Sequence, residues 1–85
     1  MENAVPDKII VYSTSWCPDC HRSKRLLDKH NVNYVEIDID DHPDAVPIVL
    51  HVNGGKRKVP TIVFPDGSTL SEPSDRKLAE KVGIL

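Results

Sequence analysis

The chain has 85 residues, which suffices for one small domain with a modest hydrophobic core. Its net charge is −2 and its charges are interspersed, which argues against a nucleic-acid surface, because such a surface needs a clustered basic face. No apolar run approaches the roughly 20 residues of a membrane span, and residues 1–7 lack the basic start and apolar stretch of a signal peptide. We therefore expect a single monomeric domain over residues 1–85 in the cytoplasm, with residues 1–7 as a loose lead-in and no nucleic-acid or membrane partner.

The first half of the chain alternates between strand and helix patterns. Residues 8–13 are rich in β-branched and aromatic side chains and too continuous for a half-exposed strand, which predicts a central strand. A helix is expected next. Pro18 suits its first turn, where a missing N–H costs nothing, and the helix should end near Asn31. Apolar and acidic residues then alternate over 35–40, which is typical of a strand with one buried face.

The next segment predicts a short helix. Residues 40–44 form a turn and helix-start cluster. Because proline is tolerated only in the first helical turn, Pro47 places the start of this helix at Asp44. The helix is expected to run to Val52 and to end in the C-cap pattern of residues 53–55.

The last third of the chain predicts a hairpin and a helix. Residues 60–64 and 68–70 have strand composition, and the Pro-Asp-Gly between them is a typical turn. The last helix is expected to open at residues 71–73, with Ser71 as its N-cap. The resulting order, β-α-β-α-β-β-α, makes the first two strands parallel because a helix joins them, and the last two antiparallel. We expect an α/β fold with a four-stranded mixed sheet flanked by three helices.

The only two cysteines, Cys17 and Cys20, lie at the junction of the first strand and the first helix. A Cys-x-x-Cys in that place indicates a redox dithiol. Only a thiolate attacks a disulfide, and the partial positive charge and unpaired N–H groups of a helix N-terminus stabilise that anion. Cys17 is therefore the expected nucleophile, ionised and reachable from solvent. Cys20, one turn further in, is the expected resolving cysteine, which attacks a mixed disulfide on Cys17 and releases the reduced substrate.

Other interpretations of this region are a structural disulfide and a zinc site. Stable disulfides are rare in the cytosol. A structural zinc site needs four Cys or His ligands, and the four histidines do not pair at the three-to-five-residue spacing of a zinc finger, so no metal site is expected.

Two charged features near the cysteines each allow two interpretations. Asp19 either disfavours the thiolate or is an ordinary first-turn acid. Residues 56–58 either form a solvated basic loop or attract an anionic thiol.

The sequence resembles a known superfamily. The element order, the Cys-Pro-Asp-Cys of residues 17–20 and the Val59-Pro60 pair that opens the third strand resemble the thioredoxins, and the short length resembles a glutaredoxin. Three stretches, residues 52–55, 59–61 and 66–70, are similar to the mycoredoxins, the glutaredoxin relatives that serve mycothiol in actinobacteria. The resemblance implies a thioredoxin-like (glutaredoxin-type) fold and a thiol-disulfide oxidoreductase.

Two positions depart from glutathione-using glutaredoxins. Thr14 stands where they usually carry a lysine, and Ser71-Glu72 where they usually carry a Gly-Gly pair. Both features help those proteins to hold glutathione, so the departures weaken glutathione as the natural thiol without excluding it. Trp16, before the first cysteine, is more thioredoxin-like.

The resemblance implies that no cofactor is bound and that a low-molecular-weight thiol, mycothiol or glutathione, is the co-substrate. It also implies a cis Val59-Pro60 peptide, whose Val59 backbone groups can pair with the peptide part of a bound thiol. The residues expected to bind the thiol are Thr14, Trp16, Pro18, Arg57, Val59, Pro60, Ser74 and Asp75.

The predicted function is the reduction of mixed disulfides between oxidised proteins and a small thiol, with mycothiol as the expected thiol. Electrons would come from a thiol or thioredoxin reductase system. Two alternatives remain: a redoxin that thioredoxin reductase reduces directly and that donates electrons to ribonucleotide reductase, and an iron–sulfur cluster carrier.

Overall fold

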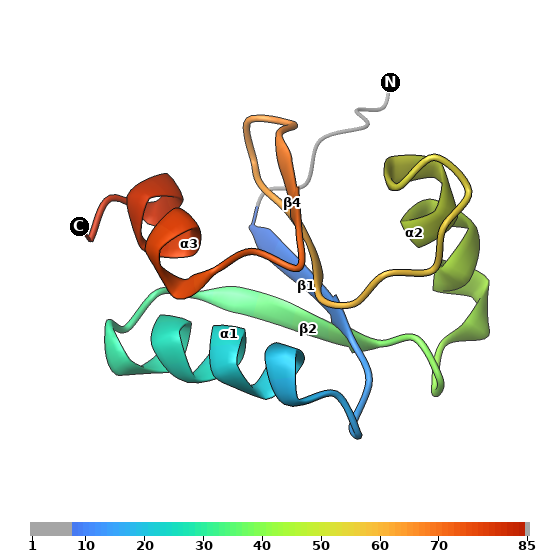
Figure 1. The fold of residues 1–85 in the computed structure, drawn as a ribbon, viewed down its shortest axis with the longest axis horizontal. Helices are drawn as coiled ribbons and strands as arrows, with labels where there is room; N and C mark the ends of the chain where they lie inside the picture. Colours follow the sequence, from blue (N-terminus) through green and yellow to red (C-terminus); the bar gives the residue numbers. More distant parts are fainter. Residues whose placement is uncertain (1–7, 85) are drawn as a thin grey trace.

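The computed structural model describes residues 8–84, so the expected lead-in at residues 1–7 lies outside the described part of the chain. Four strands form one mixed sheet in the order β2-β1-β3-β4 (Figure 1). Their bounds are β1 (Ile9–Ser13), β2 (Tyr34–Asp38), β3 (Thr61–Val63) and β4 (Thr69–Ser71). The helices are α1 (Pro18–Lys29), α2 (Val46–Val52) and α3 (Asp75–Val82), and a 3₁₀ turn, η1 (Pro43–Ala45), precedes α2. The predicted element order and the mixed sheet are confirmed.

Strand β1 lies between two neighbours, as its continuous apolar composition predicted. It runs parallel to β2, with Ser13 opposite Asp38, and antiparallel to β3, with Tyr12 opposite Thr61. Strands β3 and β4 form the predicted antiparallel hairpin. The carboxyl ends of β1 and β2 and the start of β3 therefore meet at one edge of the sheet. The loops attached to these three strand ends belong to chain segments far apart in sequence.

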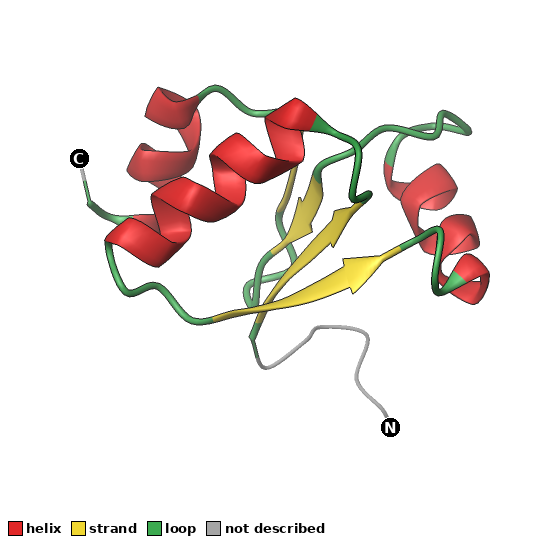
Figure 2. Cartoon of the chain, turned by 90° about the horizontal axis from the view of Figure 1, so that it is seen from below, coloured by secondary structure: helices red, strands yellow, loops and turns green. Residues whose placement is uncertain are grey.

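Helices cover both faces of the sheet, and each face has its own core. Helices α1 and α3 lie over one face, and α2 lies over the other (Figure 2). Side chains alternate between the faces along β1, as the pleat of a strand requires: Val11 packs with Leu27 and Leu78 on one face, and Tyr12 packs with Val49 on the other. This packing holds α1 against the sheet, and the helix begins at the edge where the three loops meet.

Two predicted helix starts are wrong. Helix α2 begins at Val46 rather than Asp44, after η1. An α-helix from Asp44 would need a hydrogen bond from the N–H that Pro47 lacks, whereas a start at Val46 leaves Pro47 in the first turn. The N-cap of α3 is Ser74, whose Oγ accepts the N–H of Lys77 at 3.1 Å.

Ser71 is the last residue of β4, not a helix cap. It pairs with Thr61 in the β3–β4 ladder, and its hydroxyl hydrogen-bonds the side chain of Asn53. A serine already used in this way cannot turn its oxygen to a helix that starts four residues later.

Candidate active site

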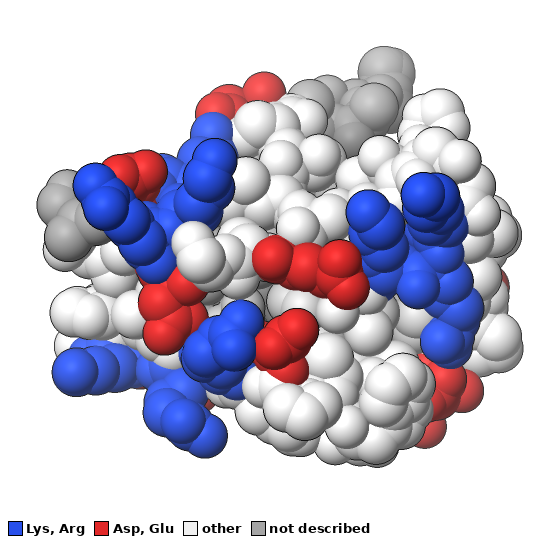
Figure 3. Space-filling model, viewed as in Figure 1, with Lys and Arg blue, Asp and Glu red and all other residues white. Residues whose placement is uncertain are grey.

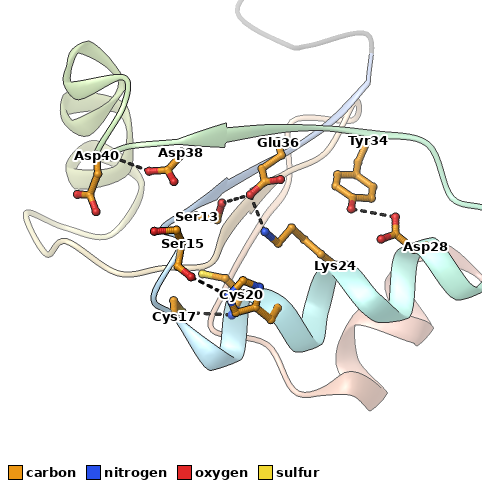
Figure 4. Close-up of polar contacts among 11 residues, drawn as sticks. Ser13, Ser15, Cys17, Cys20, Lys24, Asp28, Tyr34, Glu36, Asp38 and Asp40 are labelled. Carbon is orange, nitrogen blue, oxygen red and sulfur yellow. Dashed lines mark hydrogen bonds and ion pairs between the residues drawn. The ribbon is translucent and has the colours of Figure 1, made fainter.

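Cys17 forms the N-cap of α1. Its backbone is extended (φ −94°, ψ 112°), and its Sγ accepts a hydrogen bond from the backbone N–H of Cys20 at 3.1 Å (Figure 4). Pro18 occupies the first turn, where its missing N–H leaves no bond unmade. The sulfur thus stands where a helix presents free N–H groups and partial positive charge, and both stabilise a thiolate.

Both cysteines are free thiols, and the fold buries both of them. Cys17 is 6% exposed and Cys20 is fully buried, so Cys20 is the less exposed of the two, as predicted. The Cys17 side chain is nevertheless less exposed to solvent than the sequence suggested. The segment before β3 contributes to this burial, because the Cys17 thiol donates a hydrogen bond to the backbone carbonyl of Val59 at a Sγ···O distance of 3.7 Å.

Cys20 is held as a neutral thiol. Burial raises its pKa to about 12, and a hydrogen bond to the Cys17 sulfur acts in the same direction. The backbone of Thr14 and the charge of Lys24 oppose this shift only in part. A protonated Cys20 is a donor toward the Cys17 sulfur, so the buried thiol stabilises negative charge on its neighbour.

The loop before β3 lies directly against the nucleophile position. The Val59-Pro60 peptide bond is cis, as the resemblance implied. The hydroxyl of Thr61 donates to the carbonyl of Lys58 at 2.7 Å, and the amide of Asn53 donates to that hydroxyl at 2.9 Å. These bonds tie the loop to the end of α2 and fix the Val59 carbonyl beside the sulfur.

Two exposed residues of the site meet on a carboxylate that sequence reasoning missed. The indole N–H of Trp16 donates to Asp40 Oδ2 at 3.0 Å, and the guanidinium of Arg57 donates to Asp40 Oδ1 at 2.8 Å. Asp40 follows β2, which ends at the same edge of the sheet as β1. The available signal was an acidic residue at the end of the strand parallel to β1, where the sequence predicts only the end of a strand and a turn.

A family model for the glutaredoxins matches residues 9–68 of this chain. The chain belongs to the glutaredoxin family. This glutaredoxin is a thiol-disulfide oxidoreductase with a thioredoxin-like fold.

Similar proteins occur in actinobacteria. A Mycobacterium tuberculosis protein named as a glutaredoxin is 43% identical over 74 residues, which cover 87% of this chain and 88% of that protein. Mycoredoxin 1 of Corynebacterium glutamicum is 31% identical over 77 residues, which cover 91% of this chain and 95% of that protein. The crystal structure of a glutaredoxin from Archaeoglobus fulgidus has the same fold, with a TM-score of 0.79, 24% identity and 96% of each chain covered.

In this glutaredoxin, Asp75, the first residue of α3, lies beside the amino-terminal half of α1. Arg22 connects the two helices, because it contacts Asp19 at 3.1 Å and Asp75 at 3.4 Å. The negative charge of Asp19 is therefore shared with a guanidinium beside it, which weakens its opposition to a thiolate.

Thr14 does not reach the surface of the site. Its side chain is fully buried, and its hydroxyl has no hydrogen-bond partner within residues 8–84. The role of Thr14 in binding a thiol stays a prediction, since a side chain buried in this conformation would have to move to contact a thiol. Of the remaining predicted residues, Trp16 and Pro18 flank Cys17 in the chain, and Arg57 and Pro60 lie in the segment whose Val59 carbonyl contacts the Cys17 sulfur. Ser74 and Asp75 lie at the start of α3.

Charge is unevenly distributed around the site. Lys and Arg side chains gather over the loop between α2 and β3 (Figure 3), which carries the sequence Lys-Arg-Lys at 56–58. Within residues 8–84, no cluster of three or more His, Cys, Asp or Glu side chains could hold a metal ion. In the same part of the chain, no helix is both long and apolar enough to cross a bilayer.

Proposed function

We propose that this glutaredoxin reduces mixed disulfides between proteins and a small thiol, that Cys17 is the nucleophile and that mycothiol is the thiol. The observation that carries the proposal is the 3.1 Å hydrogen bond from the Cys20 N–H to the Cys17 sulfur at the start of α1. The helix terminus favours the thiolate of Cys17, and the protonated thiol behind it adds a further donor.

The first step is an exchange at the small-thiol sulfur of the mixed disulfide. The Cys17 thiolate attacks that sulfur, and the protein sulfur leaves with the bonding pair and takes up a proton. The protein is then reduced, and the small thiol is disulfide-bonded to Cys17. A second small thiol, as its thiolate, attacks the bound one, which gives the small-thiol disulfide and returns Cys17 as the thiolate.

Cys20 offers a second way to discharge the intermediate. Its thiolate can attack the Cys17 sulfur, which closes an intramolecular disulfide and releases the small thiol. Because burial, the largest cause of the raised Cys20 pKa, persists in this intermediate, few molecules carry this thiolate near neutral pH. We therefore assign the main route to the second small thiol, and we assign the resolving role of Cys20 to conditions in which free thiol is scarce.

Three features support mycothiol over glutathione. The residue that stands in place of the usual lysine, Thr14, is buried and uncharged. Ser71, in place of a flexible glycine, is committed to the β3–β4 ladder. One of the similar proteins bears the name Mycoredoxin 1. We place the reaction in the cytoplasm, where a free Cys-x-x-Cys pair stays reduced.

A side-by-side turnover assay tests the choice of thiol. The substrate is a protein carrying a mixed disulfide, supplied in three arms: mycothiol with its reductase, glutathione with its reductase, and thioredoxin reductase alone, each with NADPH. We expect turnover at least about tenfold faster in the mycothiol arm, since tenfold corresponds to a modest 1.4 kcal/mol of recognition. Cys17→Ser should be inactive in every arm.

The same assay separates the alternatives. Equal or faster turnover with glutathione would contradict mycothiol as the thiol. Turnover with thioredoxin reductase alone would favour the redoxin that feeds ribonucleotide reductase. A brown protein with visible absorbance after anaerobic purification, together with no turnover in any arm, would favour the cluster carrier.

A further inference from the structure

The carboxylate of Asp40 contacts two exposed residues, Trp16 and Arg57, in segments that adjoin Cys17. The two oxygens of Asp40 are used separately: Oδ2 accepts from the indole of Trp16 at 3.0 Å, and Oδ1 accepts from Arg57 at 2.8 Å. The partners are 24 and 17 residues away in sequence, so only the fold brings them together. Each partner lies beside Cys17 by a different route: Trp16 precedes it directly, and Arg57 lies two residues before Val59, whose carbonyl contacts the sulfur.

The loop that carries Asp40 is itself held by the end of the sheet. The N–H of Ile39, a residue only 1% exposed, donates to the carbonyl of Ser13 at 2.9 Å. The N–H of Asp40 donates to Asp38 Oδ1 at 2.9 Å (Figure 4). The carboxylate thus extends from a fixed backbone, and it can hold two mobile side chains in one place.

The side chains that Asp40 holds remain open to a ligand. Trp16 is 64% exposed although its N–H is bonded, so the faces of its ring are available. The side chain of Arg57 is 42% exposed. Tryptophan and arginine are enriched among the residues that dominate binding surfaces; the indole offers a large, rigid contact area, and the guanidinium offers a planar set of hydrogen-bond donors. An exposed tryptophan fixed by its polar end is therefore suited to contact a substrate bound at Cys17.

We propose that Asp40 is a positioning residue for substrate binding: it holds Trp16 and Arg57 at the mouth of the site so that a disulfide substrate docks against them. This inference rests on the proposed function and adds the surface that orients the substrate. Asp40 does not touch the Cys17 sulfur, and the contacts from Cys20 and Val59 to that sulfur do not involve it. The loss of Asp40 should therefore weaken binding and leave the chemical step unchanged.

The test is a single-turnover reaction that needs no particular reductase. The Cys20→Ser form, in which the adduct cannot be resolved internally, is mixed with increasing mycothiol disulfide, and mass spectrometry follows the thiolation of Cys17. Asp40→Ala should raise the half-saturating disulfide concentration about fivefold with the maximal rate within about twofold, as expected for exposed polar contacts. Asp41→Asn is the matched control, since it removes the neighbouring charge, and it should behave like the parent.

A double-mutant cycle assigns the effect to the contacts. Asp40→Asn keeps an oxygen that can accept the Trp16 N–H but removes the charge opposite Arg57. Asp40→Asn and Arg57→Met should each raise the half-saturating concentration about threefold, and the double variant should be no worse than either, because both changes remove the same pair. High salt should reduce the difference between Asp40→Asn and the parent, since it screens exposed charges.

Trp16 is the only tryptophan in the chain, so its fluorescence reports on the contact directly. Asp40→Ala should increase quenching by acrylamide and lower the anisotropy, whereas Asp41→Asn should not. An unchanged half-saturating concentration in Asp40→Ala, a lower maximal rate instead, or fully additive effects in the cycle would each overturn the inference. The proposed function fails separately, if the protein lacks turnover in the three-arm assay while Cys17 is still thiolated by the disulfide.

Discussion

Cys17 and Cys20 lie one helical turn apart, yet the fold treats their sulfurs in opposite ways. Cys17 is the N-cap of α1, where its sulfur accepts a backbone N–H. Cys20 lies inside the helix, fully buried, with its pKa raised to about 12. In the proposed mechanism, the same side chain carries negative charge in one place and keeps its proton in the other. The proposed division of labour between the two cysteines therefore follows from their position on the helix rather than from their chemistry.

The protonation of each cysteine affects the charge of the other. A neutral Cys20 helps to stabilise charge on Cys17, whereas a charged Cys17 disfavours charge on Cys20 through the same contact. The two sulfurs are therefore suited to act in sequence. Once Cys17 has formed a disulfide its charge is gone, and one of the causes that raise the pKa of Cys20 disappears, although burial remains.

Substitution of each cysteine by serine should give the largest contrast. Cys17→Ser should lower turnover in the mycothiol arm by more than about a hundredfold, because a serine hydroxyl is not ionised at neutral pH and cannot attack the disulfide. Cys20→Ser should keep at least about half of the activity, since a second small thiol can discharge the adduct. Equal loss in the two variants would contradict the assignment of the main route to the small thiol.

The pH dependence of the resolving step should give the next contrast. When the mixed disulfide on Cys17 is prepared and free thiol is removed, release of the bound thiol depends on the Cys20 thiolate. Because burial, the largest cause of the raised Cys20 pKa, persists in the mixed disulfide, the thiolate fraction and the release rate should rise about tenfold per pH unit between pH 7 and pH 9. Stopped-flow detection of the released thiol measures this rate, and Cys20→Ser supplies the background. A plateau below pH 9 would show that Cys20 ionises far more easily than its burial indicates.

Substitution of Lys24 should change the pKa of Cys20 by a small amount without removing either cysteine. Its charge lowers the pKa of Cys20, and its ammonium is fixed by Glu36 Oε2 at 2.5 Å, with a side chain only 14% exposed. Lys24→Met should raise the pKa of Cys20 further and slow the release of bound thiol about two- to threefold, as expected for a partly screened charge. Lys29→Met, which removes an exposed lysine from the last turn of the same helix, should leave the release rate unchanged. Similar slowing in the two variants would point to net charge rather than to the position of Lys24.

The sequence predicted the parts of the fold that depend on local patterns. The strand at residues 8–13, the Cys-x-x-Cys after it and the alternation over 35–40 were sufficient for the element order and the mixed sheet. They also placed the two cysteines at the start of the helix. These features depend on hydrophobic periodicity and on helix-terminus chemistry, which act over a few residues.

The wrong predictions concern residues whose position depends on contacts with distant segments of the chain. Ser71 is a residue type that often caps helices, but it lies in β4, where it pairs with Thr61. The burial of Cys17 depends on the Val59 carbonyl, 42 residues away. Asp40 has no local motif, and its role is visible only where the ends of β1 and β2 meet. Sequence periodicity carries no information about which side chains such loops bring together.

The smallest expected effect separates the two functions of Cys17, as a nucleophile and as an N-cap. Serine is a preferred N-cap and alanine is a poor one. Cys17→Ser should therefore unfold near the temperature of the parent, while Cys17→Ala should be less stable than Cys17→Ser by about 1 kcal/mol, which corresponds to a fall in Tm of about 4–8 °C for a domain of this size. Ser74→Ala provides the reference, because Ser74 caps α3 by the same kind of bond, at 3.1 Å to the N–H of Lys77. If both Cys17 variants melt together while Ser74→Ala melts lower, the bond from the Cys20 N–H contributes nothing to the stability of α1, and its consequence is confined to the charge on the sulfur.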